Sequence, residues 1–195
     1  MALSETDKST LLRIARSAIE SRVRGDSVAA FEAASKSLHE KRGAFVSIHK
    51  RGGLRGCIGV FTSDGPLYAA VAQMAVEAAT SDHRFPPVTE DELPEIELEI
   101  SVLTPLKKTA DVNEIEVGRH GIYIMQGGLR GVLLPQVATD HGFDREEFLE
   151  QTCMKAGLPE GAWKEEGKEA EKEDAPEIYT FEAEVFKEQV SGKKG

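Results

Sequence analysis

The sequence predicts an α+β protein of two related halves, each a β-hairpin followed by a helix and a strand. The sheets are expected to be largely antiparallel, with further helices at the N-terminus. Three observations support this fold. The segment Gly-Gly-Leu-Arg-Gly occurs twice, at 52–56 and 127–131, hydrophobic residues alternate as in strands around each copy, and an alternating pattern recurs at 96–103 and 178–186. A shared order of elements around a repeated motif indicates an internal duplication.

Residues 1–42 form the predicted N-terminal helical segment. Thr6 or Ser9 can cap a first helix, whose apolar residues recur at helical spacing up to Gly25. A second helix is expected over 27–42, because Val28, Phe31, Ala34 and Leu38 fall on one side.

The first half, 43–105, contains the first hairpin. Its predicted strands cover 44–49 and 54–61, around a turn at 51–53. Pro66 suits the first position of a helix that runs from Leu67 to about Thr80. Phe85-Pro86-Pro87 prevents further helix, and 96–103 is expected to return as a strand with one wet face.

The second half, 106–195, repeats this order. Its predicted strands cover 121–125, 129–134 and 178–186, and Asp144 and Glu147 form a capping box that opens the helix before Gly157. The segment 161–176 consists mostly of Lys and Glu, so we expect a mobile loop or a short exposed helix that can be shortened at little cost in stability.

Composition limits the classes of function. A net charge of −10 argues against non-specific binding of nucleic acid. No apolar run approaches the length of a membrane span, and the charged N-terminus does not resemble a secretory signal. Two cysteines do not make a disulfide framework, so reduced thiols and a cytoplasmic location are expected. The oligomeric state is left open.

Cys57 is the candidate reactive group. It lies in Leu54-Arg55-Gly56-Cys57-Ile58-Gly59, and the second Gly-Gly-Leu-Arg-Gly copy lacks it. In a regular strand Arg55 and Cys57 share a face, so Arg55 can stabilise a thiolate, while Gly56 and Gly59 give close access to the backbone. The alternative is that Cys57 is a small packed residue and that the glycines serve the turn and the packing.

Other candidate binding residues surround this motif in sequence. Asp82 and Arg84 can form a charged rim over a cleft, or a structural ion pair. Arg130, the counterpart of Arg55, can help to hold an anionic ligand or pair with a local carboxylate. His120 can serve as a base or bond locally within a turn, and Gln136 can present its amide to a ligand or cap a loop.

Metal and nucleotide sites have little support in the sequence. His49, His83, His120 and His141 are available as bases, but no two of them have the spacing of metal ligands, so we predict no metal. The glycine-rich turns lack the arrangement of a nucleotide-binding loop, and no cofactor is predicted.

The chain resembles the AMMECR domain family, named after the chromosomal region for Alport syndrome, mental retardation, midface hypoplasia and elliptocytosis. Its prokaryotic members are called AmmeMemoRadiSam system protein A. The matching segments are GAFVSI at 43–48, LRGCIG at 54–59, DHRFPPVT at 82–89, IELEISVLTP at 96–105, LRGVLLPQVA at 129–138 and IYTFEAEVF at 178–186.

The resemblance implies association with a Memo-type protein, related to extradiol dioxygenases, and with a radical-SAM protein. It supplies no catalytic activity. Two functional hypotheses follow. In the first, the chain is an enzyme or enzyme subunit that uses Cys57 in a cleft near LRGCIG. In the second, it is a non-catalytic protein-binding or scaffold module. A solvent-accessible Cys57 near Arg or His favours the first hypothesis, and a buried Cys57 beneath an exposed apolar patch favours the second.

Overall fold

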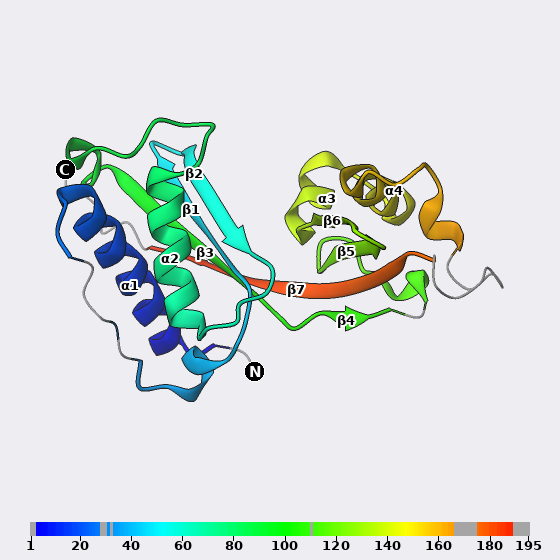
Figure 1. The fold of residues 1–195 in the computed structure, drawn as a ribbon, viewed down its shortest axis with the longest axis horizontal. Coiled ribbons are helices and arrows are strands. Elements are labelled where there is room, and N and C mark those ends of the chain that lie inside the picture. Colours follow the sequence, from blue (N-terminus) through cyan, green and yellow to red (C-terminus); the bar gives the residue numbers. More distant parts are fainter. Residues whose placement is uncertain (1–2, 28–30, 32, 110, 166–174, 189–195) are drawn as a thin grey trace. The chain divides into compact units, whose positions relative to one another are not determined.

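The computed structural model describes residues 3–27, 31, 33–109, 111–165 and 175–188 of the 195-residue chain. It has the mixed α and β structure that the sequence predicts, with antiparallel strands (Figure 1). The chain divides into two compact units, Met1–Leu103 with Glu184–Gly195, and Thr104–Ala183. Each unit has its own hydrophobic core. Within the described residues, no helix combines the length and apolar character that a membrane crossing requires.

The first unit is a sheet with two helices on one face. The sheet runs antiparallel in the order β2-β1-β3, and the elements are α1 (Glu5–Arg24), β1 (Ala44–Lys50), β2 (Gly53–Val60), α2 (Leu67–Thr80) and β3 (Ile96–Leu103). Val46 and Ile48 of β1 join Leu11 and Ile19 of α1 in one core. The alternate residues of the strands therefore point to the face opposite the helices.

The first helix begins earlier than the sequence analysis placed it. The cap is Ser4, not Thr6 or Ser9. The Ser4 hydroxyl accepts a hydrogen bond from the Asp7 amide at 3.1 Å, and the Asp7 carboxylate accepts one from the Ser4 amide at 3.2 Å. Asp at the third helical position completes the reciprocal box, a role more familiar for Glu or Gln.

The expected second helix over 27–42 is wrong for the described residues. They contain only a short 3-10 helix, Lys36–His39, and residues 28–30 and 32 lie outside the described part of the chain. The Ser37 hydroxyl donates to the Asp7 carboxylate at 2.9 Å and lies 2.7 Å from the Ser35 hydroxyl. Serine side chains that bond locally favour turns over longer helices.

The second unit repeats the plan of the first. Its strands run antiparallel in the order β6-β5-β7, with β4 on the other side of β7, and the elements are β4 (Lys107–Lys108), β5 (His120–Gln126), β6 (Leu129–Leu133), α3 (Pro135–His141), α4 (Arg145–Ala156) and β7 (Glu177–Lys187). Asp144 and Glu147 form the expected capping box, with both bonds at 2.9 Å. The helix α3 was not predicted. From Glu184 onward, β7 belongs to the first unit.

Strand register relates the two units residue by residue. Ile48 pairs with Gly56 on one side and with Leu98 on the other. Ile124 pairs in the same way with Gly131 and Ile178. In each unit the second hairpin strand is at one side, the first is central and the return strand follows. This confirms the predicted architecture of two related hairpin–helix–strand halves.

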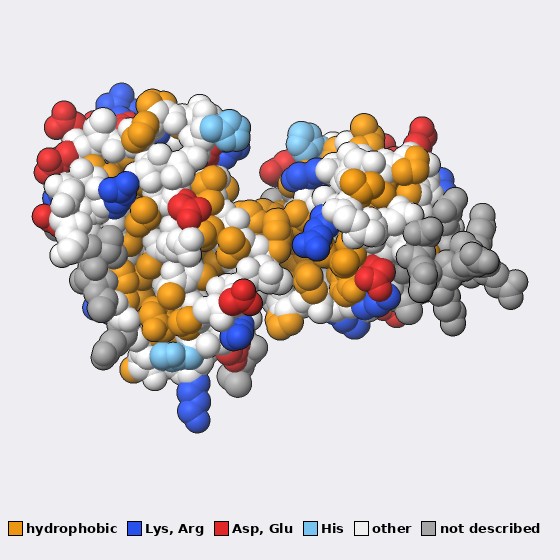
Figure 2. Space-filling view, viewed as in Figure 1, with side chains coloured by type: hydrophobic (Ala, Val, Ile, Leu, Met, Phe, Trp, Pro, Cys, Tyr) orange, Lys and Arg blue, Asp and Glu red, His pale blue; other side chains and the backbone are white. Residues whose placement is uncertain are grey.

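One glycine in each unit lies directly beneath a helix. A Cβ atom on Gly56 would lie 2.3 Å from the carbonyl oxygen of Ala78 in α2, and one on Gly131 would lie 2.5 Å from that of Thr152 in α4. α2 is rich in alanine, and its region of the first unit shows mostly hydrophobic and uncharged atoms (Figure 2). Small side chains on the helix and none on the strand allow this close approach.

The charged segment 161–176 does not begin as an exposed connection. Ala162 and Trp163 are buried, in the 3-10 helix Ala162–Glu165. The Trp163 indole nitrogen donates to the Glu150 carboxylate of α4 at 2.8 Å, and the Gly161 amide donates to the same carboxylate. The expectation rested on average composition, which one tryptophan hardly changes, although its ring buries a large apolar area. Residues 166–174 lie outside the described residues.

The glycine contact predicts a stability effect in each unit. Gly56→Ala and Gly131→Ala should each lower the free energy of unfolding by about 2 kcal/mol or more, because the new methyl group meets helix backbone that cannot move aside. Gly128→Ala is the control, since a Cβ there would meet nothing within 4 Å. Urea denaturation followed by far-UV circular dichroism measures all three. Equal effects at Gly128 and Gly131 would contradict the contact.

The packing of Trp163 predicts that this end of the charged segment is not dispensable. Trp163→Ala should lower the free energy of unfolding by about 3 kcal/mol, because a buried ring and its hydrogen bond are both lost. Exposed Glu160 provides the control, and Glu160→Ala should stay within about 0.5 kcal/mol of the parent. Circular dichroism is required, because Trp163 is the only tryptophan of the chain. If Trp163→Ala left the free energy of unfolding unchanged, this end of the segment would be dispensable, as its composition predicts.

Candidate functional site

Cys57 lies on β2, on the sheet face opposite the helices. Its neighbour Gly56 faces α2, so alternation turns Cys57 the other way. Cys57 pairs with Ser47 of β1, whose hydroxyl donates a hydrogen bond to the Cys57 Sγ at 3.2 Å. The thiol is half-buried. His49, two residues beyond Ser47, points to the same face, so a thiol, a hydroxyl and an imidazole share one surface.

His49 contains a polar atom that the fold leaves unused. Its Nε2 is buried and has no hydrogen-bond partner among the described residues. A buried polar atom without a partner costs free energy, so such atoms are uncommon in folded proteins. His49 pairs with Leu54 of β2, which is 43% exposed and lies on the same face. The face therefore combines the unpaired imidazole with an exposed apolar side chain.

An ion pair caps the backbone of Cys57 at the free edge of β2. Cys57 forms a non-hydrogen-bonded pair with Ser47, so its amide and carbonyl point away from β1. The Cys57 amide donates to Asp82 Oδ2 at 2.8 Å, and Arg84 Nη2 donates to the Cys57 carbonyl at 3.2 Å. Arg84 also donates to both carboxylate oxygens of Asp82. Two side chains thus take the place of a neighbouring strand.

Asp82 is held firmly in its ionised form. The Arg84 guanidinium, followed by the amides of Cys57 and Arg84, holds the pKa of the Asp82 carboxyl far below its usual value, although burial acts in the opposite direction. The carboxylate accepts four hydrogen bonds in all. Its side chain is 3% exposed, whereas that of Arg84 is 48% exposed. Both expected roles of the pair, structural link and charged rim, remain compatible with this placement.

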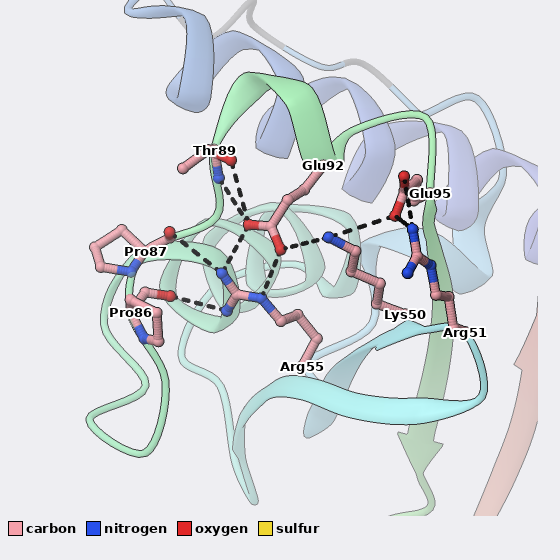
Figure 3. A network of polar contacts seen from close by, with 8 residues as sticks. All are labelled: Lys50, Arg51, Arg55, Pro86, Pro87, Thr89, Glu92 and Glu95. Carbon is pink, nitrogen blue, oxygen red and sulfur yellow. Dashed lines mark hydrogen bonds and ion pairs between the residues drawn. The ribbon is translucent and has the colours of Figure 1, made fainter.

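Arg55 does not share a face with Cys57, so it is not placed to stabilise a thiolate there. The pairing passes from Ile48–Gly56 to His49–Leu54 and leaves Arg55 as the extra residue of a β-bulge. A bulge breaks the alternation of side chains and re-aims one of them. Arg55 instead donates to both oxygens of Glu92, at 3.0 and 2.8 Å, and to the carbonyl of Pro86 at 2.8 Å (Figure 3).

The bulge follows from a shift in the turn. In the first hairpin Lys50 pairs with Gly53 around a two-residue turn, and in the second Gln126 pairs with Leu129. The first turn therefore consists of residues 51 and 52, and the second of residues 127 and 128. Relative to the repeated Gly-Gly-Leu-Arg-Gly sequence, the first turn ends one residue earlier than the second. The extra residue at Arg55 restores the register, so that Gly56 and Gly131 occupy equivalent positions. Identical sequence thus gives two different arginine positions.

Glu92 connects this arginine to the rest of the unit. It lies in the 3-10 helix Glu90–Glu92 and forms a capping box with Thr89. Hydrogen bonds from Arg55 first, then from the Thr89 amide and Lys50, lower the pKa of the Glu92 carboxyl to about 2 despite partial burial. Arg55 and Glu92 are 13% and 16% exposed. This partly buried bidentate pair fixes the loop of Pro86 and Pro87 to the hairpin.

The remaining predicted site residues either have a packing role near Cys57 or belong to the second unit. Gly59 faces Phe45, since a Cβ there would lie 2.2 Å from the ring. In the second unit His120 Nδ1 accepts a hydrogen bond from the Glu116 amide at 3.1 Å, which is a local turn contact. Arg130 is exposed, and its side chain makes no hydrogen bond among the described residues. Gln136 lies on α3 with its Oε1 buried and without a partner in that part of the chain.

The two units differ most on the face that carries Cys57. Through the shared register, five polar residues of this face in the first unit correspond to apolar or aromatic residues in the second, whereas Glu97 corresponds to Glu177. The pairs are Ser47 and Tyr123, His49 and Met125, Cys57 and Val132, Glu99 and Tyr179, and Ser101 and Phe181. One framework therefore accepts either set, and the polar set is not a requirement of the fold.

Two important residues, Ser47 and Glu92, are not among the candidates predicted from the sequence. Ser47 carries a signal in its spacing, because strand alternation places it with His49 and opposite Cys57. Glu92 carries a clearer signal, because Thr-x-x-Glu after the proline pair is a capping box. Among the described residues, no three or more His, Cys, Asp or Glu side chains are grouped to hold a metal ion.

Glu92 gives a pH-dependent prediction. Its folded pKa is depressed, so its stabilising effect is complete above the ordinary value of 4.5 and is lost as the pH falls towards about 2. Glu92→Gln should therefore lower the free energy of unfolding by roughly 2 kcal/mol at pH 7. Near the folded pKa of about 2 the substitution should change it very little. Glu90→Gln is the control, since Glu90 is 70% exposed. A cost that does not change with pH would contradict the ion pair.

Comparison with known proteins places this chain in a family. The AMMECR1 family model matches residues 12–186. The chain is 43% identical over 195 residues to a protein of Methanothermobacter thermautotrophicus, covering 95% of this chain and 96% of the other. It is 42% identical over 185 residues to Protein MJ0810 of Methanocaldococcus jannaschii, covering 91% and 88%.

Among solved structures, the chain is similar to the uncharacterized protein PH0010 from Pyrococcus horikoshii. The TM-score is 0.77 at 38% identity, and the match covers 92% of this chain and 90% of the other. The family match extends over both hairpins and the return strands of both units, and the chain belongs to the AMMECR1 family.

Proposed function

We propose that the Cys57 face is a thiol-dependent reaction site and that the protein works as an enzyme or enzyme subunit. The observation that carries the proposal is the contrast between the two units. The framework of the second unit holds apolar side chains where the first holds Cys57, Ser47 and His49. Polar side chains that the fold does not need, one of them with an unpaired buried nitrogen, are best explained by chemistry at this face.

Each residue has a defined role in this proposal. Cys57 is the nucleophile, and its sulfur attacks an electrophilic carbon, forming an S–C bond while the leaving group departs with the bonding electron pair. His49 receives the thiol proton, directly or through a water molecule. The Ser47 hydroxyl donates to the sulfur at 3.2 Å and fixes the side chain. Asp82 and Arg84 hold the Cys57 backbone, so the nucleophile sits on a fixed strand.

The proposal includes partners only through family resemblance. A Memo-type protein and a radical-SAM protein are the proposed partners, and the enzyme subunit would supply the thiol within that assembly. The alternative function is a non-catalytic docking or scaffold module. Exposed Leu54, beside His49 on the same face, favours this alternative, because an exposed apolar side chain suits a protein contact.

Alkylation of the two cysteines separates these functions. Iodoacetamide at pH 7 should modify Cys57 on the order of tenfold faster than Cys153 or more. Cys153 is fully buried in α4, and burial raises the pKa of its thiol. His49→Gln should slow the reaction at Cys57, because the proton acceptor is lost. Mass analysis of the two cysteine peptides gives both rates.

The matched controls are His83→Gln and His141→Gln, each at an exposed histidine. They should leave the rate at Cys57 unchanged. Should Cys57 react no faster than Cys153 in the folded protein, the thiol site is refuted and the docking function becomes the better account. A reactive Cys57 that does not respond to His49→Gln would remove His49 from the mechanism.

A further inference from the structure

Arg84 is the cation that lies at Cys57, although the sequence analysis assigned that role to Arg55. Its Nη2 donates to the Cys57 carbonyl at 3.2 Å. Asp82 raises the pKa of the Arg84 guanidinium most, and the Cys57 side chain raises it further, while burial lowers it. Arg55, by contrast, is occupied by Glu92 on the other side of the strand.

The ion pair is oriented with its positive end outward. The Asp82 side chain is 3% exposed, and among the described residues its carboxylate accepts hydrogen bonds only from Cys57 and Arg84, whereas the Arg84 side chain is 48% exposed. Nε and Nη2 of Arg84 make its hydrogen bonds, and among the described residues none uses Nη1. The guanidinium carbon also lies 5.5 Å from the centre of the Phe85 ring, which supports it from one side.

Two other charged side chains on this face lie farther from Cys57 than Arg84 does. Glu97 and Glu99 point to the same face from β3, two strands away from β2, which is roughly 10 Å. His49 on β1 lies between them and the edge. A group approaching Cys57 from the edge of the sheet therefore meets the half-exposed guanidinium of Arg84 before Glu97 or Glu99.

We infer that Arg84 makes the Cys57 site selective for electrophiles that carry an anionic oxygen group, a carboxylate or phosphate, next to the reacting carbon. The inference rests on the proposed thiol function and adds the class of substrate. A planar guanidinium with its counter-ion buried behind it is pre-organised to bind an oxyanion, because no rearrangement is needed before contact. The selectivity comes from the Arg84 side chain, whose Nη2 donates to the Cys57 carbonyl.

Two alkylating reagents of nearly equal size test the charge preference. Iodoacetate is anionic and iodoacetamide is neutral, and in both the sulfur displaces iodide from carbon. The ratio of their rates at Cys57 should exceed the ratio for free N-acetylcysteine by about fivefold. Arg84→Met should return the ratio to the free-thiol value, and Arg84→Lys should keep part of it. Arg13→Met, at an exposed position of α1 on the helix side, should leave it unchanged.

Salt provides a test that needs no variant. Raising sodium chloride to 1 M should reduce the ratio for the unmodified protein towards that of the free thiol, because a half-exposed charge is screened. The iodoacetamide rate alone should change little. The salt experiment therefore tests the role of the Arg84 charge even if Arg84→Met disturbs the edge of β2.

The outcomes distinguish the two proposals. If Cys57 reacts with neither reagent, the thiol function fails and the substrate class fails with it. If Cys57 reacts readily with iodoacetamide but the ratio equals that of free thiol, or is unaffected by both salt and Arg84→Met, only the role of Arg84 is overturned. A high ratio that disappears on both changes supports the anionic substrate class.

Discussion

The close approach of a strand to a helix at Gly56 sets the geometry on which the site depends. With no side chain at this position, α2 can lie against β2 at the level of Ala78. The strand cannot then rotate to present its other face, because any other residue beneath the helix would collide with backbone. Cys57 must therefore point to the opposite face. The same contact recurs between Gly131 and α4, so it belongs to the framework that the two units share.

Most of the remaining motif is explained by architecture. Arg55 is re-aimed by the bulge and joins Glu92 to the proline loop. Asp82 and Arg84 complete the edge of β2 in place of a strand. Gly59 makes room for the Phe45 ring. After these assignments Cys57 and Leu54 are the members of Leu-Arg-Gly-Cys-Ile-Gly whose side chains the framework does not require, so a function is best sought in them.

The sequence predicts the elements well where the signal is local. Alternation around the two hairpins, the helix from Leu67 to Thr80 and the box at Asp144 depend on neighbouring residues and appear as expected. The position of Arg55 depends on which residues close the turn, and two copies of one pentapeptide differ there by a residue. Trp163 was missed because its burial depends on a contact with Glu150 of another element. The position of Arg55 and the burial of Trp163 both depend on contacts between separate elements. Rules based on residue spacing within one element do not predict such contacts.

The difference between the two open faces shows which residues the shared framework does not require. A sheet face can be stable with either polar or apolar residues, provided that buried polar atoms are satisfied. The face of the second unit, with Tyr123 beside Tyr179, meets this condition, since the Tyr179 hydroxyl donates a hydrogen bond to the Glu177 carboxylate at 3.0 Å. The face of the first unit does not meet it fully, since within the described part of the chain the buried Nε2 of His49 has no hydrogen-bond partner. A protein under selection for stability alone would lose such an atom, because an apolar residue is accepted at the equivalent position of the same framework. Its presence beside a half-buried thiol therefore argues for a ligand or a proton at this site during function.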